Sequence, residues 1–374
     1  ECIAFKNADI VRRNSKTMKD NQIQINGRNI GIGHPTYFIA DIAANHDGDI
    51  ERAKELIYLC AKAGANAAKF QNFSADTIVS DYGFKNMDSK VSHQSKWSKS
   101  VYEIYDDASL PVQWTKELKE TCNNAGIDYL TAPYDISIVN ELSKYVCAWK
   151  LGSGDITWHE NIAILAQDGK PLLIATGASN MSDVEMAMEV ANRYTNDIVL
   201  MQCNTNYTAS LENFKFIALN VLKSYKEKFP NVVLGLSDHT PGHSTVLGAV
   251  TLGARVIEKH FTDNVKRDGP DHKFSMDFDS WSAMVHATRE LELALGPEKK
   301  EIMGNELETV IVQRRGIRAK HHISIGGVIK KKDIEVLRPC SNDCLPPYMI
   351  KDIIGRVSTR DIEEGDCIKL ADLE

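Results

Sequence analysis

Short apolar runs alternate with helical segments along most of this 374-residue chain, and no other feature limits its fold as strongly. The runs are apolar throughout, which is typical of parallel strands buried on both faces. The segments after them carry apolar residues at helical spacing, and several stop at a glycine, as at Gly64 and Gly126. We expect strands at residues 37–42, 67–71, 128–132, 148–151, 171–176, 198–202, 232–234 and 255–257. We expect helices at residues 50–63, 111–125, 137–144, 160–167, 182–194, 214–229, 244–252 and 280–295.

A strand–helix unit that occurs eight times in succession predicts an α/β fold, a TIM (β/α)8 barrel over residues 37–298. A doubly wound open sheet is the alternative. Such a sheet often binds a dinucleotide at a glycine-rich turn that opens a helix. Here Gly31 and Gly33 precede a strand instead, so no dinucleotide fingerprint is present.

Shorter segments flank the predicted barrel. Asn26 and Gly27 are typical of a type I′ turn, so a β-hairpin is expected at residues 23–30, where it would close the bottom of the barrel. The polar residues 9–21 are interpreted as a lead-in rather than a signal peptide. We divide the chain into lead-in and hairpin (1–36), barrel (37–298), linker (299–308) and a small β-rich domain (309–374). In that domain we expect β pieces at residues 310–312, 317–319 and 336–339, and an internal repeat of 323–329 at 362–368.

Composition narrows the possible functions. The formal net charge of −7 argues against a general binder of nucleic acid or of anionic membranes. No apolar run approaches the roughly 20 residues that a membrane-spanning helix needs. The eight cysteines lie mostly in apolar segments, so we expect them to be reduced, as in a cytoplasmic protein. Cys340 and Cys344 lack the second pair of ligands that a zinc site would need.

Polar residues follow the apolar runs at their C-terminal ends. In a parallel barrel these ends lie on one face, where active sites of such barrels are found. Lysine, serine and amide groups there suit a phosphate or carboxylate of a small molecule, and carboxylates can move protons or orient hydroxyl groups. Each could instead be an ordinary strand-end polar group, but together they favour a binding site. The set is Asp41, Lys69, Gln71, Lys150, Ser153, Asp155, Asn204, Thr205, Tyr207, Ser237, Asp238, His239 and His260.

His239 and His260 follow the last two strands of the predicted barrel. Successive strand ends lie side by side, so two neutral imidazoles could share one divalent ion that completes its shell with water or substrate oxygen. The alternative is a pair of hydrogen-bonding histidines, because two histidines far apart in the sequence are weak grounds for a metal site.

The chain resembles the sialic acid (N-acetylneuraminate) synthase family, the nonulosonate synthases, over nearly its whole length. The C-terminal segment resembles the antifreeze-like (SAF) domain of that family, including Arg314-Arg315 and Arg338-Pro339. The barrel motifs that carry the resemblance are Asn45-His46-Asp47-Gly48, Lys69-Phe70-Gln71, Lys150-Leu151-Gly152-Ser153-Gly154-Asp155, Ala175-Thr176-Gly177, Gly235-Leu236-Ser237-Asp238-His239-Thr240, Glu258-Lys259-His260-Phe261-Thr262 and Gly269-Pro270-Asp271.

The resemblance implies a carbon–carbon bond-forming transferase. It would condense phosphoenolpyruvate with the open-chain aldehyde of an N-acetylmannosamine-like sugar, add water and release phosphate. The resemblance further implies a domain-swapped homodimer, and Mn²⁺ (or Mg²⁺ or Co²⁺) held by His239 and His260. The implied catalytic residues are Asp41, Asp155, His239 and His260. The implied substrate-binding residues are Lys69, Gln71, Lys150, Ser153, Asn204, Thr205, Tyr207, Ser237, Asp271 and Arg338, the last acting from the partner subunit.

Four departures from the family pattern lie where the sugar would bind. Asp41 and Asp155 stand where members often have glutamate, Ala132 stands where a hydroxyl is common, and residues 203–208 lack the usual tyrosine–proline ending. Residues 73–110 form a long excursion, which predicts a lid or binding loop. A legionaminic- or pseudaminic-type synthase, or one that uses a phosphorylated sugar, is therefore an alternative. Less favoured are another metal-dependent TIM-barrel aldolase or hydrolase and a carbohydrate- or ice-binding protein.

Overall fold

The computed structural model describes residues 21–87 and 99–374. The chain divides into two compact units between Gly296 and Pro297. The lead-in expected before residue 21 and residues 88–98 of the long excursion lie outside the described residues.

Eight parallel strands form a closed barrel in the first unit, so the TIM-barrel prediction is confirmed and the open sheet is excluded. Each strand pairs with the next one along the chain, and the last closes the barrel against the first, where His260 lies beside Asp41. The strands are β3 (Tyr37–Asp41), β4 (Ala67–Asn72), β5 (Asp128–Pro133), β6 (Trp149–Leu151), β7 (Leu172–Ala175), β8 (Ile198–Cys203), β9 (Val233–Asp238) and β10 (Ala254–His260).

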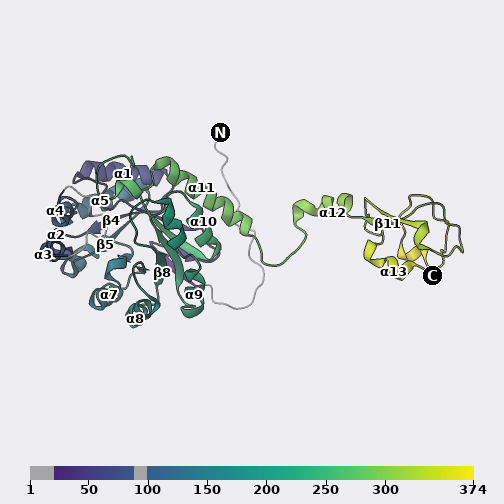
Figure 1. Cartoon of the computed structure of the whole chain (residues 1–374), viewed down its shortest axis with the longest axis horizontal. Coiled ribbons are helices and arrows are strands. Elements are labelled where there is room, and N and C mark those ends of the chain that lie inside the picture. Colours follow the sequence, from purple (N-terminus) through teal and green to yellow (C-terminus); the bar gives the residue numbers. More distant parts are fainter. Residues whose placement is uncertain (1–20, 88–98) are drawn as a thin grey trace. The chain divides into compact units, whose positions relative to one another are not determined.

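Helices surround the barrel (Figure 1). They are α1 (Ile50–Lys62), α5 (Thr115–Ala125), α6 (Val139–Leu142), α7 (His159–Gln167), α8 (Met181–Asn192), α9 (Val221–Lys228), α10 (Ser244–Thr251) and α11 (Phe278–Leu295). Their ends follow local chemistry: the Asp49 side chain accepts hydrogen bonds from the first turn of α1, and Gly126 ends α5 in the left-handed conformation. The single helix predicted at 214–229 is wrong. A 3-10 turn (Leu211–Phe216) comes first, and Ala218 at φ 52° separates it from α9.

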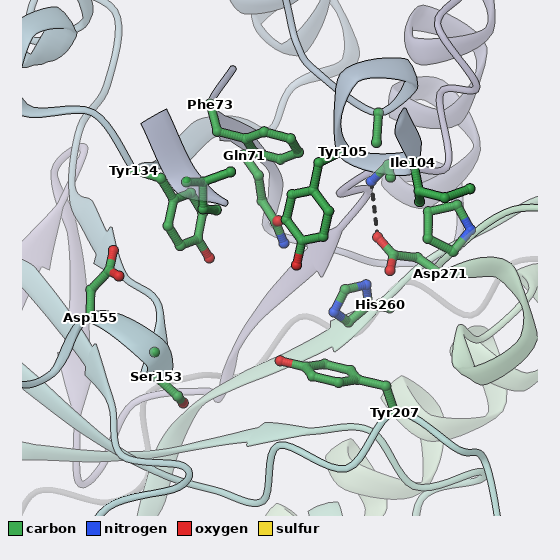
Figure 2. Close-up of a pocket in the computed structure, with 15 residues that line it drawn as sticks. Gln71, Phe73, Ile104, Tyr105, Tyr134, Ser153, Asp155, Tyr207, His260 and Asp271 are labelled. Atoms are coloured by element: carbon green, nitrogen blue, oxygen red, sulfur yellow. Dashed lines mark hydrogen bonds between the residues drawn. The ribbon is translucent and has the colours of Figure 1, made fainter. Parts of the chain in front are cut away.

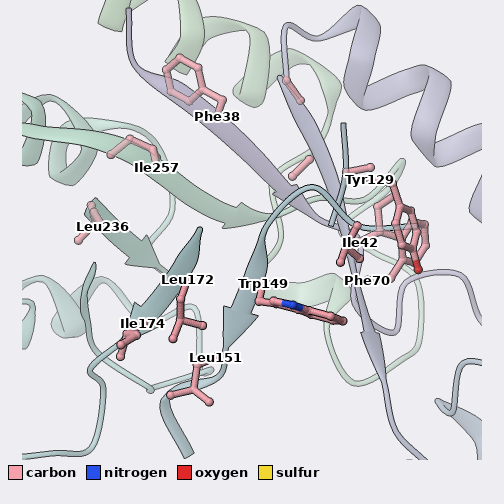
Figure 3. Close-up of a cluster of buried hydrophobic side chains, with 14 of the residues drawn as sticks. Phe38, Ile42, Phe70, Tyr129, Trp149, Leu151, Leu172, Ile174, Leu236 and Ile257 are labelled. Carbon is pink, nitrogen blue, oxygen red and sulfur yellow. The ribbon is translucent and has the colours of Figure 1, made fainter. Parts of the chain in front are cut away.

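Two layers of apolar side chains hold the barrel together. The outer layer lies between the strands and the helices and includes Phe38, Phe70 and Trp149 (Figure 3). The inner layer fills the barrel, and the hairpin of β1 (Gln22–Ile25) and β2 (Arg28–Gly31) packs Ile25 and Ile30 against it. Asn26 and Gly27 both have positive φ, as the predicted type I′ turn requires.

The barrel interior changes from apolar to charged within two residues along three of its strands. Side chains on a strand alternate between its faces, so the inward positions repeat every second residue. Ile39, Ala67 and Val256 belong to the apolar inner layer, and the next inward positions are Asp41, Lys69 and Glu258. The apolar layer therefore ends in a buried charged layer, which forms the floor of the site.

The long excursion contributes three short helices, α2 (Ala75–Ile78), α3 (Asp81–Lys85) and α4 (Val101–Asp107), which Figure 1 shows grouped together. The Tyr102 hydroxyl donates a hydrogen bond to Asp76, which ties α4 to α2. The Phe73 and Tyr105 rings also contact each other, 5.5 Å apart between centroids.

The second unit contains α12 (Leu307–Gln313), β11 (Gly316–Ala319), β12 (Ile334–Leu337) and α13 (Ile350–Ile353). The β piece predicted at 310–312 is wrong, because these residues lie in α12. Val310, Ile311 and Val312 favour a strand locally, but β propensity depends on packing against neighbouring strands, and among the described residues none pairs with this segment.

The internal repeat predicted in this unit is confirmed by its hydrogen bonds. Ile323 and Ile362 exchange two backbone hydrogen bonds, of 2.8 and 2.9 Å. Each copy continues into a 3-10 turn, Lys331–Asp333 or Leu370–Asp372, in which the aspartate carboxylate accepts a hydrogen bond from the lysine backbone N–H before the turn.

Cys344 and Cys367 form a disulfide in the second unit, with their Cα atoms 5.3 Å apart. The prediction that every cysteine is reduced is therefore wrong for this pair. The two residues lie 23 positions apart in the sequence, and no spacing signal connects them. The fold brings them together because Ile368, next to Cys367, hydrogen-bonds through its carbonyl to Leu345.

Candidate active site

The floor of the site is a buried group of charges centred on Glu258. The Lys69 and Lys150 ammonium groups lie 3.9 and 3.4 Å from its carboxylate oxygens, and the Ser237 hydroxyl donates to it at 3.0 Å. Lys69 and Lys150 are only 2% and 3% exposed. Burial lowers the pKa of Lys69, but the carboxylates of Asp41 and Glu258 outweigh it and raise that pKa overall, so the ammonium stays charged.

Asp41 joins this floor to the neighbouring side chains. Its Oδ2 lies 2.7 Å from the Lys69 ammonium, accepts a 3.1 Å hydrogen bond from Gln71 and lies 3.5 Å from Nε2 of His260. Oδ1 of Asp41 and Oε2 of Glu258 are buried and have no hydrogen-bond partner among the described residues. Buried polar atoms are normally satisfied, so these two mark positions where a ligand or ordered water is expected.

His239 and His260 come together as the sequence predicts, with ring centroids 5.3 Å apart. Burial lowers the pKa of His239 to about 4, aided by His260, and burial with the nearby Lys69 lowers the pKa of His260 to about 3. Both imidazoles are therefore neutral near pH 7. The Asn204 carbonyl lies 2.9 Å from Nδ1 of His239, so that nitrogen carries the proton and Nε2 keeps its lone pair.

The histidine pair fits a divalent ion. Nδ1 of His260 is buried with no partner in the described chain, and the Asp41 carboxylate lies beside the ring. Within residues 21–87 and 99–374, no three His, Cys, Asp or Glu side chains are arranged to hold a metal. An ion here would thus take two protein nitrogens and complete its shell with water or substrate oxygen.

Asp238 does not belong to the site, which corrects the set of strand-end residues. Ser237 faces the barrel interior, so the next side chain faces outward. There the Asp238 carboxylate binds the Lys259 ammonium at 2.5 Å and accepts hydrogen bonds from Thr240 and Thr245. This buried pair fastens β9 and β10 to the start of α10.

Ser153 lies where the ends of β6, β7 and β8 meet. Its hydroxyl accepts a hydrogen bond from the Gly177 backbone N–H at 2.9 Å. A Cβ on Gly177 would lie 2.5 Å from the Thr205 methyl carbon, so only glycine fits. Burial raises the pKa of the Cys203 thiol overall, although hydrogen bonds with Ser153 and Ser237 and the nearby Lys150 act to lower it.

A cavity of about 390 Å³ opens above the floor (Figure 2). Asp155 and Asp271 lie on opposite sides of it in this view. Burial raises the pKa of Asp155 to about 6, against the influence of Lys150, and burial raises the pKa of Asp271 to about 7. The lining residues are Ala44, Gln71, Phe73, Ile78, Ile104, Tyr105, Ala108, Tyr134, Ser153, Gly154, Asp155, Tyr207, His260, Pro270 and Asp271.

The structure brings most of the predicted site residues together. Asn204 acts through its carbonyl on His239, and Thr205 packs on Gly177. Arg338 belongs to the second unit and is exposed there. The predicted site residues that lie in the floor or at the cavity are Asp41, Lys69, Gln71, Lys150, Ser153, Asp155, Tyr207, Ser237, His239, His260 and Asp271.

Sequence reasoning gave no role to Glu258 or to the cavity aromatics Phe73, Tyr105 and Tyr134. Glu258 lies two positions before His260 on a strand, so its inward direction follows from the alternation once the strand is known to extend to His260. Tyr105 had no comparable signal, because its place depends on how the excursion folds over the strand ends.

Comparisons with known sequences agree with this architecture. The sequence model of the NeuB family matches residues 56–300, and that of the SAF domain matches residues 314–374.

No helix in the described part of the chain is long and apolar enough to cross a membrane.

Individual relatives match over nearly their full lengths. Pseudaminic acid synthase of Campylobacter jejuni (strain 81-176) is 31% identical over 92% of this chain and 98% of its own. N,N′-diacetyllegionaminic acid synthase of Legionella pneumophila is 32% identical over 90% of this chain and 94% of its own. A crystal structure of N-acetylneuraminic acid synthetase from Leptospira borgpetersenii has a TM-score of 0.68 and 25% identity, covering 78% of this chain and 95% of that one.

Proposed function

The chain belongs to the NeuB family, and from that premise we propose that it condenses phosphoenolpyruvate with the open-chain aldehyde of an acetamido aldose. Water is the third reactant, and the products are a nonulosonic acid and inorganic phosphate. The observation that carries the proposal is the pair of buried lysines, Lys69 and Lys150, next to two neutral histidines at the base of the cavity. The named relatives favour a pseudaminic- or legionaminic-type product at least as much as sialic acid.

The floor provides the donors that phosphoenolpyruvate needs. Its phosphate and carboxylate are acceptors, and the ammonium groups of Lys69 and Lys150 and the hydroxyls of Ser153 and Ser237 are donors. Buried lysines without a function are rare because desolvating a charge is costly. Asp41 and Glu258 keep Lys69 charged in the free protein, and Glu258 also lies 3.4 Å from the Lys150 ammonium.

His239 and His260 would hold a divalent ion, Mn²⁺ or else Mg²⁺ or Co²⁺, which when bound supplies Lewis-acid polarisation of the aldehyde oxygen. The protein's own part is to fix the two rings. The Asn204 carbonyl orients His239, and Tyr207 packs edge-on against the same ring at 4.5 Å between centroids. Asp41 lies 3.5 Å from Nε2 of His260, so its carboxylate would be available to the sugar aldehyde bound beside that ring.

The carboxyl groups of the cavity would serve in proton transfer and in binding the sugar. C3 of phosphoenolpyruvate attacks the aldehyde carbon, water adds at C2, and the C2–O bond to phosphate breaks. Asp155, with a pKa of about 6, can accept the proton that the water loses near neutral pH. Gln71 and Asp271 on the cavity wall can bind sugar hydroxyls.

We also propose that the protein is a cytoplasmic, domain-swapped homodimer. The exposed Arg338 of one subunit would reach the sugar bound in the other, and its guanidinium would supply paired N–H donors to sugar oxygens. Support for the swap comes from the family resemblance alone.

Phosphate release tests the proposal. The protein is incubated with phosphoenolpyruvate, Mn²⁺ and a panel of 2-acetamido aldoses, with a parallel reaction in excess chelator. We expect sugar-dependent phosphate release that the chelator abolishes. If no sugar of the panel gives phosphate while calorimetry shows metal bound, the proposed reaction is wrong.

A further inference from the structure

The cavity has an apolar wall that the barrel strands do not provide. Ile78, Ile104, Tyr105 and Ala108 come from the excursion helices and the residues next to them, and Phe73 is the first residue after β4. Figure 2 shows Phe73, Ile104 and Tyr105 along one side of the cavity, across from Asp155 and Tyr207. The ring centroids of Phe73 lie 5.5 Å from Tyr105 and 6.2 Å from Tyr134, so the wall is a packed surface.

The charged groups that line the cavity are acidic. Asp155 and Asp271 are carboxyl groups, and the described lining includes no lysine or arginine. The buried lysines of the floor are already paired with carboxylates: Asp41 lies 2.7 Å from Lys69, and Glu258 lies 3.4 Å from Lys150. Those two lysines are the donors that phosphoenolpyruvate would use.

A second phosphate would be unfavourable in this cavity. A phosphate ester carries nearly two negative charges near pH 7, and here it would face two carboxyl groups and apolar side chains. Bringing like charges together in a partly desolvated site is strongly unfavourable. A methyl or acyl group would instead bury apolar surface against the aromatic wall, which is favourable.

We infer that the cavity selects a sugar whose end remote from the aldehyde is uncharged and carries methyl or acyl groups. The selecting surface is the wall formed by Phe73, Ile104 and Tyr105. This inference rests on the proposed function, because it concerns the aldose that the synthase accepts. It distinguishes synthases of free deoxy or acylated sugars from synthases of sugar phosphates.

Three aldoses that differ only at the terminal carbon test the inference: N-acetylmannosamine, its 6-deoxy form and its 6-phosphate. With phosphoenolpyruvate and Mn²⁺ saturating, we expect kcat/KM for the 6-deoxy sugar to exceed that for the 6-phosphate by at least about a hundredfold, because the phosphate would face Asp155 and Asp271 of the same subunit in a described lining without lysine or arginine. Equal or greater use of the 6-phosphate overturns the inference and leaves the synthase proposal intact. Phosphate release from none of the three sugars, nor from any aldose of the wider panel, counts against the synthase itself.

A cation placed in the wall should change the preference. Ile104→Lys introduces a positive charge inside the cavity, and we expect the ratio of 6-phosphate to 6-deoxy use to rise about tenfold or more. The matched control is Asp106→Asn, which changes the net charge by the same amount on the exposed side of α4 and should leave the ratio unchanged. Ala108→Lys repeats the test from the end of that helix if Ile104→Lys does not fold. A ratio that rises equally in the control contradicts the inference.

Discussion

Glu258 is the carboxylate that contacts both buried lysines of the floor. It faces Lys69, Lys150 and Ser237 at once, and each of these would bind phosphoenolpyruvate in the proposed reaction. A carboxylate that neutralises two donors until an anion arrives keeps the free site stable, and it also competes with that anion. Glu258 would therefore act as a positioning residue that tunes both stability and affinity.

Glu258→Gln should destabilise the protein by about 3 kcal/mol, because it leaves buried ammonium groups with less negative charge. Chemical denaturation measures this loss. Phosphoenolpyruvate should raise the melting temperature of the variant more than that of the wild type, since the bound anion replaces the missing charge.

Glu290→Gln, at an exposed position of α11, is the matched control and should leave both quantities unchanged. A variant as stable as the wild type, with the same shift on adding phosphoenolpyruvate, would show that Glu258 has no such role.

Asp155 predicts the pH dependence of the sugar reaction. Its pKa is raised to about 6, so the carboxylate form, which accepts a proton, is lost as the pH falls below that value. With phosphoenolpyruvate saturating, kcat/KM for the sugar should fall on the acidic side of about pH 6, and at somewhat higher pH if the bound anion raises the pKa further.

Asp155→Asn should remove this acidic limb together with most of the activity, while Asp155→Glu should keep a limb at a shifted pH. If the acidic limb persists unchanged in Asp155→Asn, another group is the base.

At the scale of elements, the β6–β8 strand ends are fitted to each other around Gly177. The Gly177 N–H donates to Ser153, and the space for a Cβ is taken by the Thr205 methyl carbon and the Ser153 hydroxyl. Gly177→Ala should push apart the loops after β6 and β8, with a loss of stability of about 1–3 kcal/mol and a rise in KM for phosphoenolpyruvate. Thermal denaturation and initial rates measure the two effects.

Gly126→Ala provides the comparison. A Cβ there meets nothing, so its only cost is the left-handed conformation at φ 74°. If Gly177→Ala keeps the wild-type KM for phosphoenolpyruvate, the packing around Gly177 does not affect substrate binding, and the prediction is wrong.

The strands and helices of the barrel could be predicted from the sequence, whereas the helices of the excursion at residues 73–110 could not. Continuous apolar runs indicate buried parallel strands directly, and the strand-end residues then meet by topology. The excursion offers no such regularity: Tyr105 reaches the cavity only through contacts of α4 with Phe73 and α2, which depend on tertiary packing. Asp238 was misplaced for a different reason, since its direction depends on the strand continuing past Leu234 to include it.

At the scale of the whole molecule, the proposed swap makes each site depend on two chains. Mixing purified subunits tests this dependence. One subunit carries His239→Ala, which leaves Arg338 intact, and the other carries Arg338→Ala, which leaves the barrel intact. Random exchange should restore roughly a quarter of wild-type activity, because half of the dimers are mixed and each has one complete site.

If Arg338 acted on its own barrel, the mixed dimers would stay as weak as the parent variants. Each variant alone, carried through the same exchange procedure, is the control, and size-exclusion chromatography verifies that dimers have formed.

The internal repeat of the second unit bears on how that unit loses its structure. Backbone hydrogen bonds join the two halves at more than one point. Ile323 pairs with Ile362, and the Gly355 N–H donates to the Ile329 carbonyl, so each half satisfies backbone groups of the other. Loss of one half would leave buried donors and acceptors unmatched in its neighbour. The unit is thus expected to open in a single cooperative event, with slow and nearly uniform amide exchange across both halves rather than fraying from one end.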